Sequence, residues 1–106
     1  MKEMKNAGEE LEKALNSFRD FLLTKEFTLS KDATVNLRRY MMDRKERILF
    51  QLRRKERTPE DLAKGFRKLA EVASEIALSE GRRNVTYQDI DKARKRIFCK
   101  IWPFCE

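Results

Sequence analysis

The most informative segment of the chain is residues 73–93, ASEIALSEGRRNVTYQDIDKA. It begins as a helix with one apolar face and then reaches Gly81, which predicts a helix stop because glycine readily adopts the left-handed conformation. Residues 83–86 favour a short extended loop. Thr86 followed by Asp89 is typical of a capping box that begins a new helix. The segment therefore predicts two helices joined by a short basic loop.

This segment resembles the second half of an archaeal-type histone fold, in which a long central helix ends in a basic loop and a short last helix follows. The residues at matching positions are Gly81, Arg82, Arg83, Val85, Asp89 and Ile90. The resemblance implies that the loop faces DNA phosphate, with Arg82 pairing with Asp89 to brace the loop and Arg83 contacting DNA. It also implies that two chains clasp head to tail, so that each first loop lies beside the partner's second loop.

Helical patterns fill most of the remaining chain, which has only three glycines and two prolines. Helices are expected at about residues 3–25, 31–56, 59–80 and 87–101. Ser30 is a good N-cap, and Thr58, Pro59 and Asp61 predict a capped helix start. Gly65, inside a helix, indicates a close crossing of another helix. Residues 1–106 are therefore expected to form one all-α, histone-like domain of four helices, with the long central helix broken or kinked near Pro59.

The histone pattern fits this chain in two registers. In the first, residues 29–33 form the first loop and the central helix starts at Ser30. In the second, the basic run at 53–57 forms the first loop and the central helix starts at Thr58. The helical lids of some AAA+ ATPases have a similar histone-like end. We favour the first register, with the central helix interrupted at 57–59.

Composition favours a nucleic-acid partner. The 106 residues carry a net charge of +7, with 41% hydrophobic and 41% charged residues, and such a basic balance suits nucleic acid or an anionic surface. A core this small would gain from being shared with a second copy, so a dimer or higher homo-oligomer is expected. The absence of histidine, the few glutamines and the many charges suggest a thermophile, and the histone resemblance implies an archaeal one. No stretch resembles a secretion signal or a membrane span, so a cytoplasmic, nucleoid-associated protein is expected.

Two groups of residues are candidates for phosphate contacts. The first follows the helix stop, where guanidinium and backbone N–H groups can converge on an anion. The second belongs to or precedes the basic run at 44–57, which equally suits a solvated arm of a dimer. The candidates are Arg38, Arg39, Arg53, Arg54, Lys55, Arg57, Arg82, Arg83 and Asn84. The expected function is architectural binding of double-stranded DNA through its backbone, independent of sequence.

The alternative is a histone-like or AAA+-lid-like module that binds a protein and not DNA. Trp102 and Phe104 lie beyond the last helix, where they would cap a core or meet a protein partner. DNA binding is favoured if Arg82, Arg83 and the 44–57 cations share one surface. Protein binding is favoured if Trp102, Phe104 and Phe50 form an exposed patch. A transcription regulator with sequence preference is a third hypothesis.

Nothing in the sequence indicates catalysis. A catalytic Cys–His pair is impossible without histidine, and the chain has no glycine-rich phosphate loop, paired-carboxylate site or metal motif. We therefore expect no enzyme activity, no metal and no cofactor. Cys99 and Cys105 would form a local disulfide if Pro103 turned the chain back, and are otherwise two buried or unreactive thiols.

Overall fold

The computed structural model describes residues 2–97 and 100–104, with side chains from residue 9 onward. Its elements in chain order are α1 (Lys2–Thr24), β1 (Thr28–Leu29), α2 (Lys31–Asp43), α3 (Lys45–Arg53), α4 (Pro59–Ser79), β2 (Asn84–Val85) and α5 (Tyr87–Ile97). The expectation of a mainly helical chain is therefore confirmed. None of the described helices is long and apolar enough to cross a membrane. Cys99 and Cys105, the predicted disulfide pair, lie outside the described residues.

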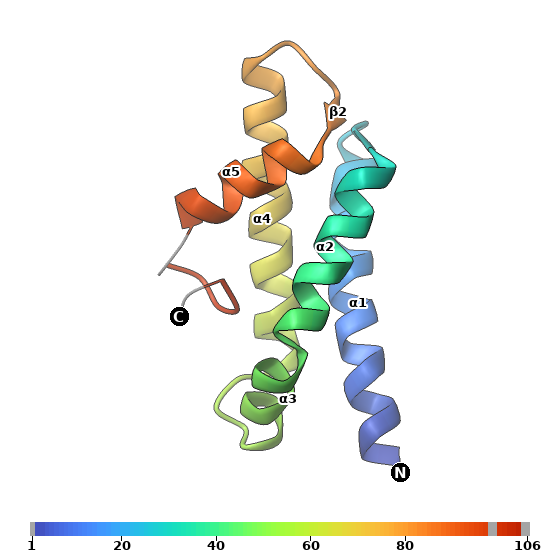
Figure 1. Cartoon of the computed structure of the whole chain (residues 1–106), viewed down its shortest axis with the longest axis vertical. Helices are drawn as coiled ribbons and strands as arrows, with labels where there is room; N and C mark the ends of the chain where they lie inside the picture. Colours follow the sequence, from blue (N-terminus) through green and yellow to red (C-terminus); the bar gives the residue numbers. More distant parts are fainter. Residues whose placement is uncertain (1, 98–99, 105–106) are drawn as a thin grey trace.

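Two long helices, α1 and α4, pack along each other and form the body of the molecule (Figure 1). α5 crosses α4 and also contacts α2. Each long helix buries residues spaced by three or four, as an amphipathic helix must to keep its apolar face out of water. The central ones are Leu15, Phe18 and Leu22 of α1 and Leu62, Phe66 and Leu69 of α4.

The two loops pair with each other inside the one chain. β1 and β2 are parallel, with Thr28 opposite Asn84 and Leu29 opposite Val85. The histone resemblance would place this contact between two chains. Here the chain reverses direction after α3, so that α4 runs back toward the loop that precedes α2 (Figure 1). The first loop therefore meets the second loop of its own chain.

The helix expected at 31–56 is divided at Arg44 into α2 and α3. The described residues therefore contain five helices, not the four that were expected. Arg44 falls on the apolar stripe between Met41 and Ile48, which are both buried. Its backbone leaves the helical region (φ −105°, ψ 5°), and its guanidinium lies 4.7 Å from the ring centre of Tyr40. Since burying a guanidinium in an apolar core is costly, the break lets this cation avoid the core.

The interruption near Pro59 is a complete break. Residues 54–58 lie outside the helices, and Lys55 has a positive φ of 60°. The hydroxyl of Thr58 accepts a hydrogen bond from the backbone of Asp61 (3.1 Å), and the Asp61 carboxylate accepts one from the backbone of Thr58 (3.0 Å). This capping box satisfies the N–H groups exposed at a helix start. It fixes the beginning of α4 where the sequence predicts it.

The segment 100–104 packs against α4 as part of the core. Trp102 and Phe104 are 9% and 2% exposed, and the ring of Phe104 lies 5.2 Å from that of Phe66. The predicted protein-partner surface at Trp102 and Phe104 is therefore wrong, because both side chains are covered by this chain. A β-carbon at Gly65 would lie 2.1 Å from the carbonyl oxygen of Trp102. The glycine thus admits this segment, and not a crossing helix.

Candidate nucleic-acid interface

The basic loop after α4 is held by one arginine. Gly81 has a φ of 73°, which turns the chain out of the helix. The Arg82 guanidinium donates to both carboxylate oxygens of Asp89 (2.9 and 2.8 Å), to the carboxylate of Glu80 (2.6 Å) and to the carbonyl of Asn84 (2.9 Å). These four bonds join the end of α4, the loop and the start of α5. The geometry makes Arg82 a bracing residue of the loop.

The charges of this cluster stabilise one another. Burial alone would raise the pKa of the Asp89 carboxyl, but hydrogen bonds from Arg82 and Thr86 outweigh burial and hold its pKa below the usual range. The hydrogen bonds to Asp89 and Glu80 raise the pKa of Arg82. The hydrogen bond from Arg82 likewise lowers the pKa of Glu80. All three groups are charged at neutral pH, and the charge of Arg82 is largely balanced within the protein.

Arg83 and Asn84 face the first loop. The Arg83 guanidinium donates to the carbonyl of Lys25 (2.9 Å) and lies 5.0 Å from the ring centre of Phe27. The amide oxygen of Asn84 accepts a hydrogen bond from the Thr28 hydroxyl (2.8 Å). Each of these contacts crosses from the second loop to the first. The predicted phosphate ligands of this loop are therefore engaged in holding the two loops together.

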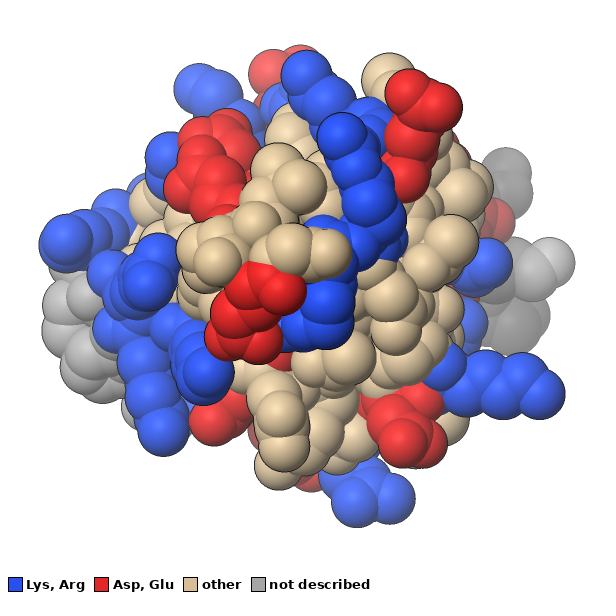
Figure 2. Space-filling view, turned by 90° about the horizontal axis from the view of Figure 1, so that it is seen from above, with Lys and Arg blue, Asp and Glu red and all other residues tan. Residues whose placement is uncertain are grey.

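The end of the molecule formed by residues 25–30 and 81–86, which we call the loop end, is not uniformly basic. Viewed from that end, acidic and basic side chains are interspersed over the face (Figure 2). Lysine and arginine side chains gather at the left edge of this view, on the side where α5 lies in Figure 1. The exposed cations of α5 are Lys92, Lys95 and Arg96.

The other predicted phosphate ligands lie far from the loop end. The turn at 54–58 is at the opposite end of the 45 Å long axis (Figure 1). There Arg54 lies over the Phe50 ring and near Glu56, and Arg57 lies over the Trp102 ring. Arg53, the last residue of α3, and Lys55 of the turn are also exposed there.

On α2, Arg38 forms an ion pair with Glu12 of α1 (2.6 Å), and Arg39 is exposed. The predicted residues therefore do not share one surface. The condition set for DNA binding, that Arg82, Arg83 and the 44–57 cations share one surface, is not met. The condition set for a protein-binding patch is not met either, since Trp102 and Phe104 are buried.

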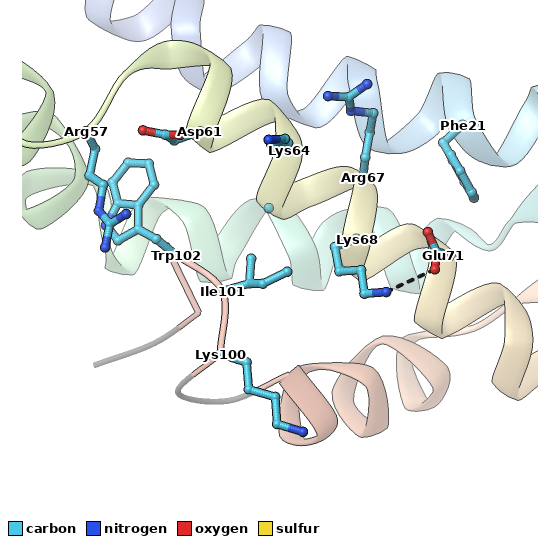
Figure 3. A pocket seen from close by; sticks show the side chains of 11 residues that line it. Phe21, Arg57, Asp61, Lys64, Arg67, Lys68, Glu71, Lys100, Ile101 and Trp102 are labelled. Atoms are coloured by element: carbon cyan, nitrogen blue, oxygen red, sulfur yellow. Dashed lines mark hydrogen bonds and ion pairs between the residues drawn. The ribbon is translucent and has the colours of Figure 1, made fainter.

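A basic groove lies instead between α4 and the segment 100–102 (Figure 3). It has a volume of about 670 Å³, and Phe21 of α1 contributes to its wall. Its cations are Arg57, Lys64, Arg67, Lys68 and Lys100, and its carboxylates are Asp61 and Glu71. We call it the α4–tail groove. It carries an excess of three positive charges over an apolar base of Ile101 and Trp102.

Both carboxylates of the α4–tail groove have partners of their own. Asp61 accepts the hydrogen bond from the Thr58 backbone, which is the main reason its pKa is lowered. Glu71 accepts a hydrogen bond from Lys68 (3.0 Å; Figure 3). Within residues 9–97 and 100–104, Lys64, Arg67 and Lys100 have no ion-pair partner. The groove can thus supply up to three cationic donors to an anion such as phosphate.

Part of this groove was readable from the sequence. Lys64, Arg67 and Lys68 are spaced by three and four, so they must share one face of a helix. They were not among the predicted phosphate ligands, because only the apolar face of that helix was assigned a role. Lys100 reaches the groove because segment 100–102 folds onto α4, which no local pattern indicates.

In comparisons with protein-family models, with curated proteins and with solved structures, nothing matches this chain. The candidate interface therefore rests on the chain's own geometry and charge.

Proposed function

We propose that this chain is a small architectural DNA-binding protein that contacts the phosphate backbone through the α4–tail groove, independent of sequence. The observation that supports it is the set of three cations, Lys64, Arg67 and Lys100, that lack ion-pair partners among the described side chains. Lysine and arginine at such a surface bind phosphate by replacing its counterions. Phosphate contacts carry no sequence information, so the binding is general.

The spacing of the groove suits a polyanion. Lys64 and Lys68 are separated by about 6 Å along α4, because an α-helix rises about 1.5 Å per residue. One strand of duplex DNA presents one phosphate per about 3.4 Å of its axis. Two neighbouring phosphates therefore lie within reach of these two lysines. Arg67 and Lys100 extend the basic surface on either side.

We further propose that the fold is histone-like, closed within one chain. A helix, a short strand and a second helix occur twice, as α1–β1–α2 and as α4–β2–α5, and the Arg82–Asp89 pair occupies the place that the histone resemblance implies. The paired loops use Arg82 and Arg83 for internal bonds. Phosphate binding is therefore assigned to the α4–tail groove. All residues of that groove come from one chain, so a dimer is not required to form it.

The test is a fluorescence-anisotropy titration of mixed-sequence duplex DNA at several salt concentrations. Affinity should fall with salt, with a log–log slope of about −0.9 for each phosphate contacted. Replacing Lys64, Arg67 and Lys100 with glutamine should make the slope shallower by about two to three units and lower the affinity at least about tenfold in 0.1 M salt.

The matched control removes three exposed cations outside the groove, in the variant Arg19→Gln, Lys31→Gln, Arg53→Gln. Its net charge equals that of the groove variant, so a loss caused by net charge alone would appear in both. The proposal is wrong if the wild type does not bind duplex DNA at low salt, if binding ignores salt, or if both triple variants bind alike.

A further inference from the structure

A second basic hollow lies on α2, α3 and α5. It has a volume of about 680 Å³. Its cations are Arg39, Arg44, Arg47 and Arg94, and its carboxylates are Asp43 and Glu46. We call it the arginine hollow. Four guanidinium groups against two carboxylates leave an excess of two positive charges, so an anion bound there would relieve their mutual repulsion.

Tyr40 organises the arginine hollow. The guanidinium carbons of Arg44 and Arg94 lie 4.7 and 4.6 Å from its ring centre. The ring of Phe104 stacks on it with centres 5.6 Å apart, and Arg94 is also held by Asp91 (2.5 Å). A guanidinium stacked on an aromatic ring can still donate from its edge, in the fork geometry that suits phosphate. The hollow is therefore a preformed set of donors from three helices.

The two basic sites face different sides of the molecule. They share no lining residue. Lys64 lines the α4–tail groove, whereas Phe66, two residues on and thus nearly opposite on the helix, contacts the Phe104 ring that stacks on Tyr40. The buried segment 102–104 therefore lies between them. Together they hold five of the seven net positive charges of the chain.

We propose that the arginine hollow is a second phosphate-binding site that takes a second DNA duplex, so that one copy of this chain bridges two duplexes. The inference rests on the proposed function of the α4–tail groove. To occupy both sites, a single duplex would have to bend around a body 25 × 21 Å in cross-section. DNA resists such a bend, because its persistence length is about 150 base pairs. Two separate duplexes satisfy both sites without bending.

The experiment is a capture assay. A biotinylated duplex is fixed to streptavidin beads, protein is added, and retention of a labelled second duplex of unrelated sequence is measured. The wild type should retain the second duplex. The variant Arg39→Gln, Arg47→Gln should bind a single duplex in solution within about threefold of wild type, but should lose capture at least about tenfold. The control Arg19→Gln, Lys31→Gln removes equal charge elsewhere and should capture normally.

Thermal melting of each variant checks that it is folded. If the double variant does not fold, Arg39→Gln alone is used, since Arg39 is exposed and has no ion-pair partner in the described part of the chain; it should lose capture several-fold. Normal capture by the folded variants would overturn the inference and assign bridging to two protein copies. A wild type that binds one duplex but never captures a second would also overturn it. Absence of any duplex binding removes the proposed function and this inference together.

Discussion

Replacing Gly65 with alanine tests whether segment 100–104 is an integral part of the core. In an open helix this change would stabilise the protein by about 1 kcal/mol, because alanine is the better helix former. At Gly65 the added β-carbon would lie 2.1 Å from the carbonyl oxygen of Trp102 and 3.0 Å from the Pro103 ring. A backbone carbonyl cannot rotate aside as a flexible side chain can. The segment must therefore lift away from α4.

The cost of that movement can be worked from burial. Trp102 and Phe104 are both buried aromatics, each covering about 200 Å², so their exposure costs about 10 kcal/mol at about 25 cal/mol per Å². Freeing five residues regains about 1.5 kcal/mol each, or about 7.5 kcal/mol. The remaining loss of about 2.5 kcal/mol is partly offset by the helix gain of about 1 kcal/mol. Gly65→Ala should thus destabilise the protein by about 1.5 kcal/mol.

Urea unfolding measures this free energy, and fluorescence reports the segment directly, because Trp102 is the only tryptophan. The emission of folded Gly65→Ala should shift to the red as Trp102 meets water. The control Ala63→Gly, a half-buried position on α4, should cost about 1 kcal/mol and leave the emission of the folded protein unchanged. A Gly65→Ala protein more stable than wild type, with unaltered emission, would refute the reasoning.

Three further predictions concern the polar contacts that fix the helix ends. Asp89→Ala should lower the free energy of unfolding by about 2 kcal/mol at pH 7, because it removes the buried carboxylate that accepts hydrogen bonds from Arg82 and from the Thr86 backbone; an unchanged urea midpoint would count against this. Because the folded-state pKa of Asp89 lies below the unfolded value of about 3.9, its stabilisation is complete well above that pH and is lost as pH falls through the folded value. Wild type should therefore lose stability more steeply than Asp89→Ala between about pH 5 and 2, and parallel curves would contradict the assignment. Thr58→Ala should cost about 1 kcal/mol in the same urea assay, and an unaltered midpoint would show that the capping box contributes nothing.

The helix starts were predictable because they depend on contacts three residues apart. Ser30 accepts a hydrogen bond from the backbone of Ala33, Thr58 forms the expected capping box, and Asp89 accepts one from the backbone of Thr86. These residues can be read as caps without knowing what the helix packs against. The helix stop at Gly81 is local in the same way.

The break at Arg44 and the path of segment 100–104 were not predictable by the same means. The apolar stripe of 31–56 is continuous apart from Arg44, and one cation on a stripe does not show whether the helix bends or the side chain extends to water. Likewise, Trp102 and Phe104 suit a core or an interface equally well by composition. What decides between them is that Gly65 has no side chain, so the backbone of Trp102 can pack directly against α4. This is a contact between distant parts of the chain.

The residues of the candidate site also divide into those that a local sequence pattern indicates and those that only the folded structure brings together. The basic face of α4 has a local signal, since Lys64, Arg67 and Lys68 repeat at helical spacing. By contrast, Arg82 and Arg83 look like exposed loop cations until the first loop is placed beside them. The arginine hollow also depends on placement, because Arg94 of α5 and Arg44 lie over the same Tyr40 ring.

The pairing of the first loop with the second also means that the fold cannot be completed on the ribosome until the second loop has been synthesised. α1 and β1 are synthesised first, yet α1 packs chiefly against α4, and β1 pairs with β2 across 56 residues. At about 5–20 residues per second, translation from Thr24 to Ser79 takes roughly 3–11 s. During that interval the side chains of Leu15, Phe18 and Leu22, which are fully covered in the folded protein, lack their main partner, α4. How long this apolar stripe stays uncovered is therefore set by the speed of synthesis and not by the speed of folding.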